Sequence, residues 1–209
     1  MDKKRIIFSV DGTLVQTHRE PLQEFLEQEA QGSGKYFKNH FPDILADYET
    51  RFLMYNKDQL LWHLNRYSKQ KLTPRFLEDL FLFNAKVEPQ PTEEIKATLE
   101  YLKKKKYELV ILTNWFKTPQ EEKLRALGIR QYFPEVYSGE DFLKPNPESY
   151  HLAMGKHSAK ECYIVGNNYE LDIKGAAYVG LEGIYLDPTD QHDYKGPKIK
   201  KISELTRYL

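Results

Sequence analysis

The stretch RIIFSVDGTL, residues 5–14, decides the fold of this chain. Its first half is a short apolar run, which is typical of a strand buried on both faces. An Asp-Gly pair, Asp11-Gly12, follows at once and indicates a tight loop. We therefore predict a buried strand at residues 6–10, which contains Ser9 and runs into a tight loop at Asp11-Gly12.

Strand and helix signals alternate along the rest of the chain, with one long interruption. Residues 19–86 lack strand character and carry helical patterns instead, at about 22–26, 37–55, 58–67 and 74–84. Thr118-Pro119-Gln120-Glu121 has the pattern of a capping box with proline at the first helical position. We expect further strands at residues 109–112, 136–138, 163–165 and 183–186, and helices at residues 92–105, 118–127, 171–179, 202–208 and from Asn146-Pro147.

Strands separated by helices of this length pair in parallel through right-handed crossovers. The expected fold class is α/β, a doubly wound and mainly parallel sheet with an inserted all-helical domain. We predict that residues 1–17 and 87–209 form the α/β core and that residues 18–86 form the helical domain. Such an insertion would lie above the carboxyl edge of the sheet, where open α/β folds bind ligands.

The composition excludes several classes of function. The chain has 209 residues with 31 Lys and Arg against 31 Asp and Glu, so its charge gives no argument for a nucleic-acid or membrane partner. No apolar run is long enough to span a membrane, and the N-terminus lacks the pattern of a signal peptide. The single cysteine, Cys162, lies in an apolar run and is expected to be a buried thiol. We expect a cytoplasmic protein.

Four polar segments fall at the carboxyl ends of four predicted strands: residues 9–13, 113–114, 144–147 and 166–172. In this order they resemble the four motifs of the haloacid dehalogenase (HAD) superfamily, and the resemblance covers essentially the whole chain. The first motif of that family is a strand followed by Asp-x-Asp-Gly-Thr-Leu, and the fourth is Gly-Asp-x-x-x-x-Asp. The resemblance implies a Rossmann-like core with a helical cap, and four motifs in order are strong evidence for it.

The resemblance also implies roles in phosphoryl transfer, where catalysis is mostly positioning and electrostatics. In the family the first Asp attacks phosphorus, and here that position is Ser9. The second Asp, which moves the proton, matches Asp11; the Thr that holds phosphoryl oxygens matches Thr113; and the neutralising Lys matches Lys144. The implied phosphate-binding set is Val10 and Asp11 through backbone N–H groups, with Thr113, Asn114 and Lys144.

The implied magnesium ligands of this chain are the backbone carbonyl of Asp11, together with Asn167 and Asp172. Ser9 and Asn167 each stand where the family has an Asp, so both changes remove negative charge from the metal site. Mg²⁺ prefers anionic oxygen ligands, and we therefore expect its binding to be weak or absent. Loss of a covalent nucleophile costs on the order of 10⁴–10⁶ in turnover. Because two positions of the site differ from the family, 9 and 167, we expect natural divergence rather than a variant inactivated on purpose.

Three alternatives would preserve an enzyme. Ser9 could be the nucleophile, although a serine needs a base or a strong metal to activate it. Asp11 could be the nucleophile with Thr13 two residues later, a register that resembles P-type ATPases of the same superfamily. Metal-independent dehalogenation is a third alternative, because Asn167-Asn168 is similar to an Asn-rich fourth motif, but that reaction also uses the missing carboxylate.

We therefore expect a HAD hydrolase-like scaffold for a small phosphorylated metabolite, with turnover weak or absent. The alternative is a non-catalytic pseudo-phosphatase that binds a phosphorylated ligand, inorganic phosphate or a protein partner. Among other residues, we expect Trp115 and Phe116 to face a ligand and His18 to be the histidine nearest the cleft. The aromatic residues of the helical block are expected to be mainly core, namely Tyr36, Phe37, Phe41, Tyr48, Phe52, Tyr55, Trp62 and Tyr67.

Overall fold

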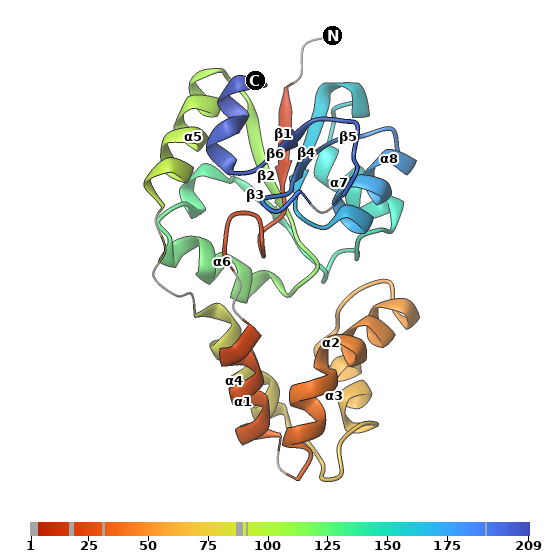
Figure 1. Cartoon of the computed structure of the whole chain (residues 1–209). Coiled ribbons are helices and arrows are strands. Elements are labelled where there is room, and N and C mark those ends of the chain that lie inside the picture. The colour runs from red at the N-terminus through yellow and green to blue at the C-terminus, as the bar shows by residue number, and fades with distance from the viewer. Residues whose placement is uncertain (1–3, 17–18, 31, 87–89, 91, 191) are drawn as a thin grey trace.

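The computed structural model describes residues 4–16, 19–30, 32–86, 90, 92–190 and 192–209. Within these residues, six parallel strands form one sheet in the order β3-β2-β1-β4-β5-β6 (Figure 1). The predicted α/β fold class is confirmed. The strands are β1 (Arg5–Phe8), β2 (Glu108–Leu112), β3 (Glu135–Tyr137), β4 (Cys162–Gly166), β5 (Glu182–Leu186) and β6 (Lys198–Ile199).

Strand β1 lies inside the sheet, between β2 and β4, and its hydrophobic side chains face both sides. Ile6 and Phe8 belong to the cluster on one face, which is covered by α5 (Glu93–Lys104) and α6 (Lys117–Ala126). Ile7 belongs to the cluster on the other face, under α7 (Pro147–Met154) and α8 (Ala176–Tyr178). Every residue of β1 is buried, as the sequence predicted for a strand with helices on both sides.

The helical block contains α1 (Arg19–Glu29), α2 (Gly34–Arg51), α3 (Lys57–Asn65) and α4 (Pro74–Ala85), which share a separate hydrophobic cluster. Figure 1 shows these helices beyond the end of the sheet that lies away from both chain termini. Trp115 and Phe116, from the loop after β2, belong to the same cluster and join the block to the sheet. None of the described helices combines the length and hydrophobicity that a membrane span requires.

The structure differs from the sequence predictions in four places. The capping box at Thr118 is wrong, because α6 begins at Lys117 and its N-cap, Phe116, makes no side-chain capping bond. The predicted helix at residues 171–179 begins as a π-helical turn (Tyr169–Gly175), whose wider winding buries both Asp172 and Ile173. The short edge strand β6 was not predicted. The C-terminal helix is a 3₁₀ helix, Ile202–Arg207.

Most other sequence predictions hold. Asn146 caps α7 by accepting the backbone N–H of Glu148, and Cys162 is buried. Of the aromatic residues of the helical block, Tyr36 and Trp62 are exposed, so the prediction that they are core is wrong for these two. His18 lies outside the described residues. The domain boundaries stay a prediction, because residues 17–18 and 87–89 also lie outside them.

Replacing Phe8 tests the packing under the central strand. Phe8 is fully buried and meets Phe133 edge to face, with ring centroids 5.8 Å apart. We expect Phe8→Ala to lower the free energy of unfolding by about 3–5 kcal/mol, measured by urea denaturation, because it leaves a cavity in the core. The matched control is Tyr178→Ala, since the side chain of Tyr178 is 86% exposed and its loss should leave stability nearly unchanged. Equal effects of the two changes would contradict the assignment of β1 as the central strand.

Candidate functional site

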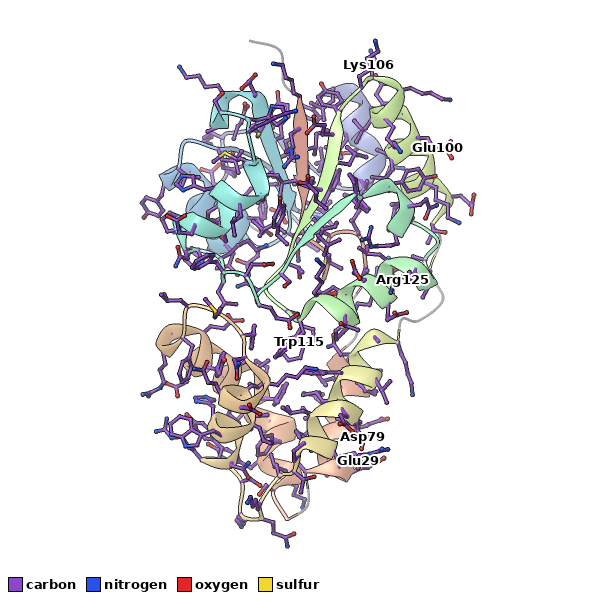
Figure 2. All side chains as sticks on the ribbon, turned by 180° about the vertical axis from the view of Figure 1, so that it is seen from behind. Glu29, Asp79, Glu100, Lys106, Trp115 and Arg125 are labelled. Atoms are coloured by element: carbon purple, nitrogen blue, oxygen red, sulfur yellow. The ribbon has the colours of Figure 1, made fainter. Side chains whose placement is uncertain are left out.

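A cavity of about 310 Å³ lies between the carboxyl edge of the sheet and the helical block. Both parts of the chain line it, as expected for a ligand site in an open α/β fold. Figure 2 shows Trp115 at this junction. All the predicted site residues except Val10, which was predicted to act through its backbone, line the cavity: Ser9, Asp11, Thr113, Asn114, Lys144, Asn167 and Asp172.

Lys144 lies at the centre of the polar part of the site. Its Nζ donates to Asp172 Oδ1 at 2.5 Å and to Ser9 Oγ at 3.3 Å. The side chains of this ion pair are almost fully buried, 3% exposed for Lys144 and 0% for Asp172. The other oxygen of Asp172 accepts the backbone N–H of Asn168 at 3.0 Å. Lys144 is therefore a hydrogen-bond donor to both Ser9 and Asp172.

Asn114 holds Lys144 in place through the main chain. The backbone N–H of Lys144 donates to Asn114 Oδ1 at 2.7 Å, and Asn114 Nδ2 donates to the carbonyl of Lys144 at 2.9 Å. The side-chain amide of Asn114 is thus engaged in joining the loop after β2 to the loop after β3. A direct bond from Asn114 to phosphate stays a prediction.

Asp11 forms a second ion pair that the sequence analysis did not predict. Lys123 Nζ donates to Asp11 Oδ1 at 2.6 Å, and Gln120 Nε2 donates to Asp11 Oδ2 at 2.5 Å. Both partners come from α6 and are buried. Gln120 and Lys123 are three residues apart, which places them on one face of a helix, and this spacing is the sequence feature that could have indicated their shared role.

Gln120 also links Asp11 to Thr113. Its Nε2 donates to Thr113 Oγ1 at 2.9 Å, so the hydroxyl hydrogen of Thr113 is free to donate into the cavity. Gln120 Oε1 is buried and has no hydrogen-bond partner among the described residues. The backbone N–H at the start of α6, that of Lys117, donates to the carboxylate of Glu140 at 2.7 Å. That N–H is therefore already occupied in this structure.

Asn167 packs against the loop of the first motif. Thr13 Oγ1 donates to Asn167 Oδ1 at 3.1 Å. Gly12 has a φ of +74°, and a Cβ added there would lie 2.2 Å from Asn167 Nδ2. The loop therefore requires glycine at this position, both for its left-handed conformation and for the close approach of Asn167.

A family model described as haloacid dehalogenase-like hydrolase matches residues 3–180 of the chain. The chain belongs to this family. A ribulose-1,5-bisphosphate 5-phosphatase from Halopiger xanaduensis is 36% identical over 104 residues, which are 48% of this chain and 44% of that protein. A glyceraldehyde 3-phosphate phosphatase from Methanocaldococcus jannaschii is 26% identical across 97% of this chain and 95% of its own length. The first two curated relatives are matched over less than half of their length, 44% and 45%.

Solved structures share the fold over the whole chain. The HAD phosphatase of Thermococcus onnurineus has a TM-score of 0.68 at 22% identity and covers 98% of this chain and 97% of its own. The HAD-hydrolase YfnB of Bacillus subtilis, described as bound to magnesium, has a TM-score of 0.71 at 19% identity, with coverage of 100% and 99%. At these identities the likeness establishes the fold alone.

The residues of this chain do not fit a magnesium ion. Both oxygens of Asp172, the one carboxylate among the predicted ligands, already accept hydrogen bonds, and its charge is paired with the ammonium of Lys144. The neighbouring carboxylate of Asp11, whose predicted ligand atom is the backbone carbonyl, is paired with Lys123. Ser9 and Asn167 supply only neutral oxygens. Within the described part of the chain, no group of three or more His, Cys, Asp or Glu side chains is placed to hold a metal ion. Mg²⁺ favours carboxylate ligands, and these carboxylates are engaged by cations.

A double-mutant cycle tests the buried ion pair. We expect Lys144→Met to lower the free energy of unfolding by about 3–5 kcal/mol, because it leaves the carboxylate of Asp172 buried without a counter-charge. The double change Lys144→Met and Asp172→Asn should recover most of this loss, as measured by urea denaturation.

The matched control is Lys174→Met, which breaks the exposed pair of Lys174 with Glu170 and should leave stability nearly unchanged. If the double change is as unstable as Lys144→Met alone, the pair is not the source of the effect.

Proposed function

We propose that this protein binds a small phosphorylated molecule or inorganic phosphate in the cavity and does not form an aspartyl phosphate. The observation that carries the proposal is the environment of Ser9, where a neutral hydroxyl stands 3.3 Å from the ammonium of Lys144. At the position where the family forms a covalent bond to phosphorus, this chain has a serine instead of a carboxylate. The ammonium of Lys144 lies beside that serine and could bind an anion.

Charge balance supports anion binding without a metal. Asp11 is paired with Lys123, which lies behind it on α6, and Asp172 is paired with Lys144, so each aspartate at the polar end of the cavity has a counter-charge. An Asp at residues 9 and 167 would add two negative charges and repel a phosphate dianion. Their replacement by neutral residues removes that repulsion.

Hydrogen-bond donors are available on several sides of the cavity. We propose the hydroxyl of Thr113, the ammonium of Lys144 and the backbone N–H groups of Val10 and Asp11 as phosphate ligands. The next two N–H groups of that loop, of Gly12 and Thr13, already donate to backbone carbonyls. Successive N–H groups in such a loop form a concave anion site.

The same contacts disfavour the catalytic alternatives. Ser9 needs a base, but its partner Lys144 donates a hydrogen bond to it and forms an ion pair with Asp172. Asp11 would be a poor nucleophile in the alternative register, because Lys123 and Gln120 engage both of its oxygens. Dehalogenation also needs a carboxylate at residue 9. A metal-dependent phosphomonoesterase stays the second candidate, because several relatives are phosphatases by name.

We also propose that residues 18–86 act as a cap over this site and residues 1–17 and 87–209 as its core. The support is the set of contacts across the junction. Tyr55 N–H donates to the carbonyl of Gly139 at 2.6 Å, and Leu143 N–H donates to the carbonyl of Leu53 at 2.9 Å. A cap in this position would exclude water from a bound ligand.

Calorimetric titration with inorganic phosphate in the presence of EDTA tests the binding proposal. We expect saturable binding, weakened about tenfold or more in Thr113→Val, because a hydrogen bond to a charged group is worth about 1.5–3 kcal/mol. The control is Thr118→Val, which removes the hydroxyl of an exposed threonine on α6. Absence of binding at millimolar phosphate would overturn the proposal.

Turnover of para-nitrophenyl phosphate separates the two candidates. We expect no magnesium-dependent hydrolysis by the natural chain, because the nucleophile is missing. The double variant Ser9→Asp and Asn167→Asp should gain magnesium-dependent activity, which recovers part of a loss on the order of 10⁴–10⁶. Magnesium-dependent turnover by the unaltered chain that disappears in Asp11→Ala would establish the phosphomonoesterase instead.

A further inference from the structure

We propose that the helical end of the cavity recognises a protonated amino group, so that the ligand is a small phosphomonoester carrying a primary ammonium. This inference rests on the proposed function, in which Lys144 and Thr113 hold the phosphate. It concerns the opposite end of the same cavity, which is lined by Glu49, Asn84 and Trp115.

Glu49, on α2, supplies an acceptor with no cation of its own. Tyr55 donates its hydroxyl to Glu49 Oε1 at 2.8 Å. Among the described residues no Lys, Arg or His forms an ion pair with Glu49. Burial raises the pKa of Glu49, an effect that the bond from Tyr55 and the charge of Lys144 partly offset. A carboxyl group taken from water without a counter-ion is costly, and a cationic ligand group would supply the missing charge.

Two further polar atoms at this end are buried and unsatisfied. Asn84 Oδ1, on α4, and Trp115 Nε1, after β2, have no hydrogen-bond partner among the described residues. Buried polar groups are nearly always paired, so these atoms point to a ligand. A primary ammonium has three donors, which suits Glu49 and Asn84 as acceptors, and Trp115 Nε1 would donate to an oxygen of the same ligand.

Aromatic rings enclose this end of the cavity. Tyr55 and Trp115 meet edge to face with centroids 5.2 Å apart, and both line the cavity with Phe41. Aromatic faces attract a cation that has left water. The volume of about 310 Å³ is at the low end for ligand sites, which limits the ligand to a small metabolite.

Calorimetric titration of the whole chain in EDTA at pH 7 tests this inference with three esters. Phosphoethanolamine carries the ammonium, 2-hydroxyethyl phosphate replaces it with a hydroxyl, and ethyl phosphate has neither. We expect phosphoethanolamine to bind at least about tenfold more tightly than the other two, as charge-assisted hydrogen bonds predict. In Glu49→Gln this advantage should largely disappear, while ethyl phosphate still binds at least as tightly, because the change removes a negative charge near Lys144.

The control is Glu29→Gln, an exposed carboxylate that Figure 2 shows far from Trp115, and it should keep the full advantage. Asn84→Leu is a second variant and should reduce the advantage without affecting ethyl phosphate. Equal binding of the three esters by the natural chain, or an advantage that survives Glu49→Gln, would overturn the inference while leaving the proposed function intact. If none of the three binds, the proposed function itself fails and this inference fails with it.

Discussion

The buried ion pair between Lys144 and Asp172 is the interaction on which the site depends. It joins the loop after β3 to the turn after β4, and its ammonium also reaches Ser9 at the end of β1. Three loops at the carboxyl edge of the sheet are therefore fixed relative to one another. A buried pair of this kind is a weak source of net stability, but breaking it leaves an unpaired charge. In this chain it also holds the ammonium of Lys144 beside Ser9, at the carboxyl edge of the sheet.

A second pair, between Asp11 and Lys123, completes the charge balance of the site. Together the two pairs engage both aspartate carboxylates at the polar end of the cavity. The chain has the scaffold of a HAD hydrolase. The groups that we propose as phosphate ligands, such as the hydroxyl of Thr113 and the ammonium of Lys144, are all hydrogen-bond donors. The residues at positions 9 and 167 and the pairing of Asp11 and Asp172 are the support for our proposal of binding without turnover.

Much of the fold and of the core side of the site could be predicted from the sequence. The apolar run before Ser9 placed the central strand, and loops after parallel strands must meet at one edge. Lys123 and Gln120 were missed because polar residues on a surface helix usually face solvent, and the start of that helix was predicted from a capping box that does not form. Glu49 and Asn84 lie 35 positions apart in the helical block and belong to no motif, so only tertiary packing brings them to one cavity.

The central claim is that the cavity holds a phosphomonoester without hydrolysing it. The most direct measurement follows ethyl phosphate by ³¹P nuclear magnetic resonance as the protein is added, first in EDTA and then with excess Mg²⁺. We predict that the ester resonance shifts or broadens in EDTA and that no inorganic phosphate appears after Mg²⁺ is added. Growth of an inorganic phosphate signal once Mg²⁺ is present, in proportion to the protein added, would contradict it.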